Sequence, residues 1–159
     1  GVAILISDKT NFKATAVKKD KEGHYIMIKG LVQQENITIL NIYAPNTRAP
    51  KFIKQLLLAQ RNEIEGNTMI VGDFNTPLTA LDKSSRQKAN KETVDLNYTL
   101  KTSISTWNIL QDRSYIGHKT SCNKFKKIKI ISSTLSDHSE IKLEMNSKGT
   151  LKTKQMHGN

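Results

Sequence analysis

A predicted strand that is followed by a helix and a second strand most constrains the fold of this chain. Residues 36–43 are expected to form the first strand, with Ile37 and Ile39 on one face. Leu40 and Ile42 lie on the other face of the same strand. Because a strand with two apolar faces must be covered on both sides, we expect residues 36–43 to occupy the centre of a layered sheet.

The predicted helix follows this strand and begins at Pro50, since proline is well placed in a first helical turn. Apolar residues recur at helical spacing up to Ile64, and Gly66 is placed to end the helix. Residues 68–71 then form a short buried strand that ends at Gly72. This order of elements predicts an α/β fold.

Weaker patterns predict the remaining elements. A charged turn is expected at residues 19–23, where Gly23 can take a positive φ. The segment at 76–92 is polar and loop-like, and residues 103–115 have no clear period. We expect one partial domain over residues 1–146 and a basic, disordered tail over 147–159. The other expected elements are strands at residues 2–6, 12–16, 24–29, 127–132 and 140–145 and a helix at 91–100.

Charge and composition restrict the class of partner. The 159 residues include 25 Lys and Arg against 14 Asp and Glu, a formal net charge of +11. Such a charge favours binding to polyanions, although a solvated lysine-rich surface would have the same composition. The single cysteine, Cys122, excludes an intrachain disulfide and favours a reducing compartment. No apolar run approaches the roughly 20 residues of a membrane span, so no membrane partner is expected.

A Gly-Asp-Phe-Asn-Thr-Pro motif follows the predicted buried strand, where side chains reach the rim of a sheet. Asp73 and Asn75 are two residues apart and can face the same side of a turn. A carboxylate can activate a water or protonate a leaving oxygen, and a carboxamide can donate N–H groups to a phosphate. An ordinary turn is the alternative, because Asp and Asn both stabilise turns through their own backbone.

Two further motifs also lie at strand ends. Tyr43 ends the predicted central strand in the sequence Asn-Ile-Tyr-Ala-Pro-Asn, and its phenol could bind a phosphate or close the core. Ser136, Asp137 and His138 precede the last predicted strand. The histidine offers a base or a cation near pH 7, while a loop with a solvated charge pair is the alternative. The three motifs together suit metal-assisted phosphodiester cleavage.

With these motifs in place, the chain resembles the endonuclease/exonuclease/phosphatase superfamily. It is most similar to the endonuclease domains of mammalian LINE-type retrotransposon replicase polyproteins. The resemblance implies a four-layer α/β sandwich, with two sheets packed face to face, helices outside and the site at one edge. The matching stretches are residues 1–10, 20–26, 39–46, 71–78, 86–91 and 134–139.

The resemblance implies that the domain nicks one DNA strand by phosphodiester hydrolysis and leaves a 3′ hydroxyl for reverse transcription. Tyr43 and Asn46 would contact the scissile phosphate. Asp73 would position the water or help to protonate the leaving group, and Asn75 would orient the phosphate. DNA is the implied partner, with RNA as a second polyanion and the remainder of the polyprotein as a protein partner. A nuclear location with a cytoplasmic pool follows from that role.

The last motif supplies the remaining implied roles. Asp137 would assist on the metal side, His138 would stabilise the phosphate or act as a base, and Ser136 could donate to a phosphate. Mg²⁺ is the expected ion because hard oxygen ligands suit it, and Mn²⁺ is the alternative.

The sequence also departs from the family. The family's Glu, its main metal ligand, belongs to a segment upstream of Gly1, so we expect a truncated copy with impaired catalysis. No Asp stands before His118 where the family has one, so His118 is expected in a surface loop. Three hypotheses therefore stay open: an endonuclease domain, a non-catalytic basic module that binds nucleic acid, and a translated remnant without function.

Overall fold

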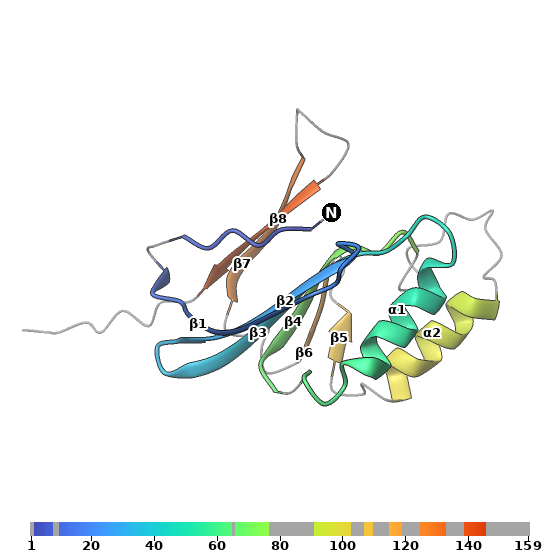
Figure 1. Ribbon diagram of the computed structural model, residues 1–159, viewed down its shortest axis with the longest axis horizontal. Coiled ribbons are helices and arrows are strands. Elements are labelled where there is room, and N and C mark those ends of the chain that lie inside the picture. Colours follow the sequence, from blue (N-terminus) through green and yellow to red (C-terminus); the bar gives the residue numbers. More distant parts are fainter. Residues whose placement is uncertain are drawn as a thin grey trace, which may run out of the picture.

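The computed structural model describes residues 2–7, 10–64, 66–76, 91–102, 107–109, 115–118, 125–132 and 139–145. Six strands form one sheet in the order β1-β2-β3-β4-β6-β5, and β7 pairs with β8 in a second sheet (Figure 1). In chain order the elements are β1 (Lys13–Lys19), β2 (Tyr25–Val32), β3 (Glu35–Tyr43), α1 (Ala49–Ala59), β4 (Thr68–Asp73), α2 (Lys91–Thr102), β5 (Trp107–Ile109), β6 (Tyr115–His118), β7 (Phe125–Ser132) and β8 (Ser139–Met145).

The predicted strand-helix-strand unit is confirmed at the centre of the main sheet. β3 pairs antiparallel with β2 on one side and parallel with β4 on the other. A parallel pair needs a crossover connection, and α1 lies between these two strands in the chain. The carboxyl ends of β3 and β4 therefore meet at one edge of the sheet, with Tyr43 opposite Asp73.

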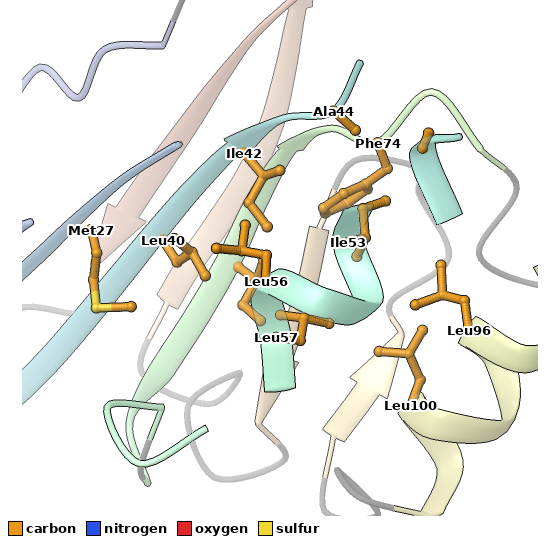
Figure 2. Packing of buried hydrophobic residues seen from close by; sticks show 12 residues of the cluster. Met27, Leu40, Ile42, Ala44, Ile53, Leu56, Leu57, Phe74, Leu96 and Leu100 are labelled. Carbon is orange, nitrogen blue, oxygen red and sulfur yellow. The ribbon is translucent and has the colours of Figure 1, made fainter. Parts of the chain in front are cut away.

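The core lies between the main sheet and the two helices, which cover one face of it (Figure 1). Leu40 and Ile42 of β3 are fully buried there, together with Ile53 of α1 and Leu96 of α2. Figure 2 shows these side chains pointing toward one another across the layer. β7 and β8 lie on the opposite side of the main sheet (Figure 1). The α/β class predicted from the sequence is thus confirmed.

The first helix is shorter than its apolar pattern predicts. It starts as expected, with proline in its first turn, but it ends at Ala59 instead of continuing to Gly66. The chain turns at Gln60, whose carbonyl accepts the N–H groups of both Glu63 and Ile64. Gln60 is buried, and Lys18 Nζ of β1 donates to Gln60 Oε1 at 3.0 Å. Contacts with a distant strand therefore end the helix, and Gly66 belongs to a later turn.

Residues 2–7 do not form the strand that their apolar run predicts. A strand needs a partner, and none of the described strands pairs with this segment. A side-chain bond instead connects it to the main sheet, where Asn41 Nδ2 donates to the carbonyl of Ala3 at 2.9 Å. The side chain of Leu5 is 95% exposed, so this apolar residue adds no core.

The second half of the chain contains two strands that the sequence did not reveal. β6 lies between β4 and β5, and Ile116 pairs with Ile70 on one side and Ile109 on the other. His118, expected in a surface loop, is instead the last residue of β6 and pairs with Trp107. The expectation was wrong because a strand of only four residues is stabilised by its two neighbours and leaves little periodicity.

Among the described helices, neither is long and apolar enough to cross a membrane. The predicted tail over residues 147–159 lies outside the described residues, so the division of the chain at residue 146 stays a prediction.

Candidate functional site

Two of the three sequence motifs meet where β3 and β4 end. Tyr43 and Asp73 are the last residues of these parallel strands and lie opposite each other. The N–H of Ala44 donates to the carbonyl of Asp73 at 2.9 Å and continues the pairing one step beyond the strands. The segments after the two strands therefore leave the sheet side by side.

Gly72 allows this close approach. Its φ is +136°, which residues with a side chain rarely adopt, and its backbone lies against Ile42 of β3. A Cβ atom at this position would lie 1.9 Å from the carbonyl oxygen of Ile42. The glycine of the Gly-Asp motif is thus required by backbone packing, and it determines where Asp73 emerges.

Phe74 fixes the direction of the two polar residues beside it. Its side chain is 2% exposed and belongs to the core cluster. Figure 2 shows the ring pointing toward Ile53 of α1, close to Ala44. Because Phe74 is buried, its neighbours Asp73 and Asn75 both lie exposed at the surface.

Asn75 joins the two segments through its side-chain amide. Asn75 Nδ2 donates to the carbonyl of Ala44 at 2.7 Å and to Asn46 Oδ1 at 3.0 Å. An amide nitrogen carries two hydrogens, so both Asn75 donors are occupied. Asn46 accepts with its oxygen and is exposed at the surface, so its own Nδ2 is not used in this contact. Among the side-chain amides of the cluster, that of Asn46 can therefore donate to an anion.

Asp73 completes the cluster with one carboxylate. Its Oδ1 accepts the backbone N–H of Asn75 at 3.1 Å, within the turn where Asn75 has a φ of +47°. Among the described residues, no partner is seen for the other carboxylate oxygen. An exposed carboxylate of this kind can hydrogen-bond a water molecule or a protonated oxygen.

The structure thus places four predicted site residues at one edge of the sheet: Tyr43, Asn46, Asp73 and Asn75. Their catalytic roles stay predictions. The remaining candidates Ser136, Asp137 and His138 lie outside the described residues, in the segment before β8.

The described residues offer few ligands for a metal ion. No group of three His, Cys, Asp or Glu side chains in this part of the chain could hold one. At the cluster itself, Asp73 supplies the carboxylate, Asn46 and Asn75 supply carboxamides, and Tyr43 supplies a phenol. The Mg²⁺ ion expected from the sequence therefore stays a prediction.

A charged loop next to this edge was only partly foreseen. The turn at residues 19–23 was expected, and Gly23 has the predicted positive φ of +77°. The sequence did not reveal that His24 Nδ1 lies 3.0 Å from Asp20 Oδ2. This hydrogen bond holds the pKa of the Asp20 carboxyl below its usual value. The carbonyl of His24 also accepts the N–H of Tyr43 at 2.7 Å.

Comparison with known proteins agrees with this architecture. A scan of known protein families found no matching family model. Among solved structures, the chain is similar to the endonuclease domain of TRAS1, a telomere-specific non-LTR retrotransposon, with a TM-score of 0.58 and 12% sequence identity. The similarity covers 84% of this chain and 69% of the TRAS1 domain. At this identity the likeness establishes the fold alone: the chain shares the fold of the TRAS1 domain.

Proposed function

We propose that this chain is an endonuclease domain of a LINE-type retrotransposon that nicks one strand of DNA. The proposal includes membership of the endonuclease/exonuclease/phosphatase superfamily and an incomplete four-layer sandwich, without the family's N-terminal strands and an internal segment. It rests on one observation above all: Asn75 binds both Ala44 and Asn46, and so holds the ends of two motifs together at the edge where β3 and β4 stop. DNA is the proposed substrate in the nucleus, with RNA and the rest of a polyprotein as further partners.

The cluster divides the work of phosphodiester hydrolysis among its side chains. The Nδ2 donors of Asn46 would bind a phosphate oxygen, and Asn75 would orient the phosphate indirectly by holding Asn46 in place. Asp73, whose carboxylate is exposed, would position the attacking water or help to protonate the leaving oxygen. Tyr43 would add a phenol at the end of β3.

The segment before β8 completes the proposed site by motif. Ser136 would donate to the phosphate, His138 would stabilise it or act as a base, and Asp137 would join Asp73 on the metal side. Mg²⁺, or Mn²⁺ in its place, would offset the negative charge of the phosphate when bound. Because the cluster presents a single carboxylate among the described residues, we expect weak metal binding and slow nicking.

A plasmid-nicking assay tests this proposal. Supercoiled plasmid is incubated with Mg²⁺ or Mn²⁺ in the presence of one of three chains. These are the wild type, the Asp73→Ala variant and the matched Asp95→Ala variant. Asp95 is also an exposed carboxylate, but it lies on α2 and pairs with Lys54 of α1. Slow nicking by the wild type and Asp95→Ala, lost in Asp73→Ala and on chelation, is the expected result. Equal nicking by all three chains, or none by a folded wild type with either ion, would refute the proposal.

A second candidate function is non-catalytic binding of nucleic acid. The edge strand β1 favours it, because all seven of its residues are exposed and they include Lys13, Lys18 and Lys19. Binding of this kind should weaken steeply as salt rises, by release of counterions from the phosphates. It should also be unchanged in Asp73→Ala. Salt-dependent DNA binding without any metal-dependent nicking would favour this second function.

A further inference from the structure

The hairpin loop between β1 and β2 lies directly beside the candidate site. Tyr25 and Ile42 form the last pair between β2 and β3, and His24 is the next residue toward the site. Its carbonyl accepts the N–H of Tyr43 at 2.7 Å, which is shorter than most backbone hydrogen bonds. The peptide of His24 therefore fixes the final residue of β3 from the side opposite β4.

Asp20 fixes that peptide in turn. Asp20 Oδ2 accepts the backbone N–H of His24 at 3.3 Å and lies 3.0 Å from His24 Nδ1. The backbone of Asp20 also closes the loop, because its N–H donates to Tyr25 at 3.1 Å and its carbonyl accepts from Gly23 at 3.3 Å. One half-buried carboxylate thus holds both the main chain and the ring of His24.

Helix α1 limits the movement of the ring. The ring of Phe52 lies 5.2 Å from that of His24, measured between centroids, and is tilted by 52° to it. Glu22 lies 3.6 Å from His24 Nδ1, but its side chain is 79% exposed. Asp20 therefore makes the closer, half-buried contact with His24. Glu22 is a nearby exposed carboxylate that can serve as a control.

We propose that Asp20 and His24 are positioning residues for Tyr43: they hold the end of β3 at the place where the candidate site needs its phenol. The chain of contacts runs from the Asp20 carboxylate through the His24 peptide to the Tyr43 N–H. This role rests on the proposed function, because it matters for chemistry only if Tyr43 contacts a phosphate. Neither residue needs to touch the substrate.

Amide hydrogen exchange measured by NMR tests the role without DNA. In Asp20→Ala, the Tyr43 amide should exchange roughly tenfold faster, as expected when one well-formed hydrogen bond is weakened. The amide of Ile39, deeper in β3, should keep its protection and so reports an intact fold. Glu22→Ala removes the neighbouring carboxylate as a matched control and should leave Tyr43 unchanged.

The conservative variant separates positioning from general stability. Asp20→Asn keeps a side-chain oxygen that can accept the His24 N–H, so it should restore most of the protection at Tyr43. If Asp20→Ala unfolds, the Ile39 amide will also lose protection. His24→Ala, which removes the ring and its bond to Asp20, is then measured in its place. Unchanged exchange at Tyr43 in a folded Asp20→Ala or His24→Ala chain would overturn the proposal. That result would leave the proposed function intact, because the nicking assay tests it separately.

Discussion

Replacing Gly72 by alanine should destabilise the fold more than any other single methyl addition at the site. The new Cβ would lie 1.9 Å from the carbonyl oxygen of Ile42 and 2.8 Å from its carbonyl carbon and nitrogen. Real Cβ atoms essentially never approach other heavy atoms within 3.0 Å, and these neighbours are backbone atoms that cannot rotate away. Either the Gly72 backbone changes its φ of +136°, or β3 and β4 separate at the site.

Two costs determine how far Gly72→Ala lowers the stability: backbone strain at residue 72 and the crowding of its new methyl group. A side chain in a sparsely populated backbone region costs about 1–3 kcal/mol. Forcing a methyl group into a packed region costs about 1–3 kcal/mol as well. We therefore expect Gly72→Ala to lower the free energy of unfolding by about 2–6 kcal/mol. For a domain of this size the melting temperature should fall by roughly 4–24 °C.

Gly66 supplies the matched control. It also has a positive φ, of +40°, but a Cβ atom there would meet nothing within 4 Å. Gly66→Ala should therefore cost only the backbone strain, about 1–2 kcal/mol. Thermal unfolding followed by circular dichroism measures both variants. If Gly72→Ala melts no lower than Gly66→Ala, the inference that close packing against Ile42 places Asp73 is wrong.

Three further predictions concern the contacts around the sheet. Gly30→Ala would bring a Cβ within 2.3 Å of the Phe12 ring. Urea unfolding should show that the free energy of unfolding falls by about 1–3 kcal/mol, and adding Phe12→Ala should recover part of that loss. The bond to His24 lowers the pKa of Asp20 in the folded chain. The ionised Asp20 carboxylate therefore stabilises the fold above the unfolded pKa of about 3.9, and this stabilisation is lost as pH falls through the lower pKa of the folded chain. Thermal unfolding of Asp20→Asn should accordingly depend less on pH between about 5 and 3, whereas an unchanged pH dependence would contradict this pairing. Lys54→Ala, which breaks a surface ion pair between α1 and α2, should cost less than about 1 kcal/mol in the same measurement.

The sequence predicted those features that local periodicity determines. The two-faced strand over residues 36–43 lies at the centre of the sheet, and the glycine at position 72 lies at the end of the next strand, as expected. The sequence also indicated Asp73 and Asn75 as site residues, because the polar turn after a buried strand places its side chains at the rim of a sheet. These conclusions need only the order of residues within about ten positions.

Features that depend on distant partners could not be read in the same way. The early end of α1 depends on Gln60, whose side chain binds Lys18 of β1, 42 residues away in the chain. The position of Asn46 depends on Asn75, which lies 29 residues further along. Residues 2–7 look like a strand by composition, but pairing with a neighbour decides whether a strand forms. Long-range contacts thus determine both the element boundaries and the orientation of the site's amide groups.

Asp73→Ala should separate the chemistry of the site from its stability. The carboxylate is exposed and, among the described residues, accepts the N–H of Asn75 at 3.1 Å, so its loss should cost only about 0.5–1.5 kcal/mol. The turn should keep its shape because Phe74 remains buried and Asn75 still binds Ala44. We therefore expect Asp73→Ala to melt within roughly 6 °C of the wild type while its nicking activity is lost. A variant that unfolds as readily as Gly72→Ala would show instead that the carboxylate holds the turn together, and loss of nicking would then say nothing about its role in the reaction.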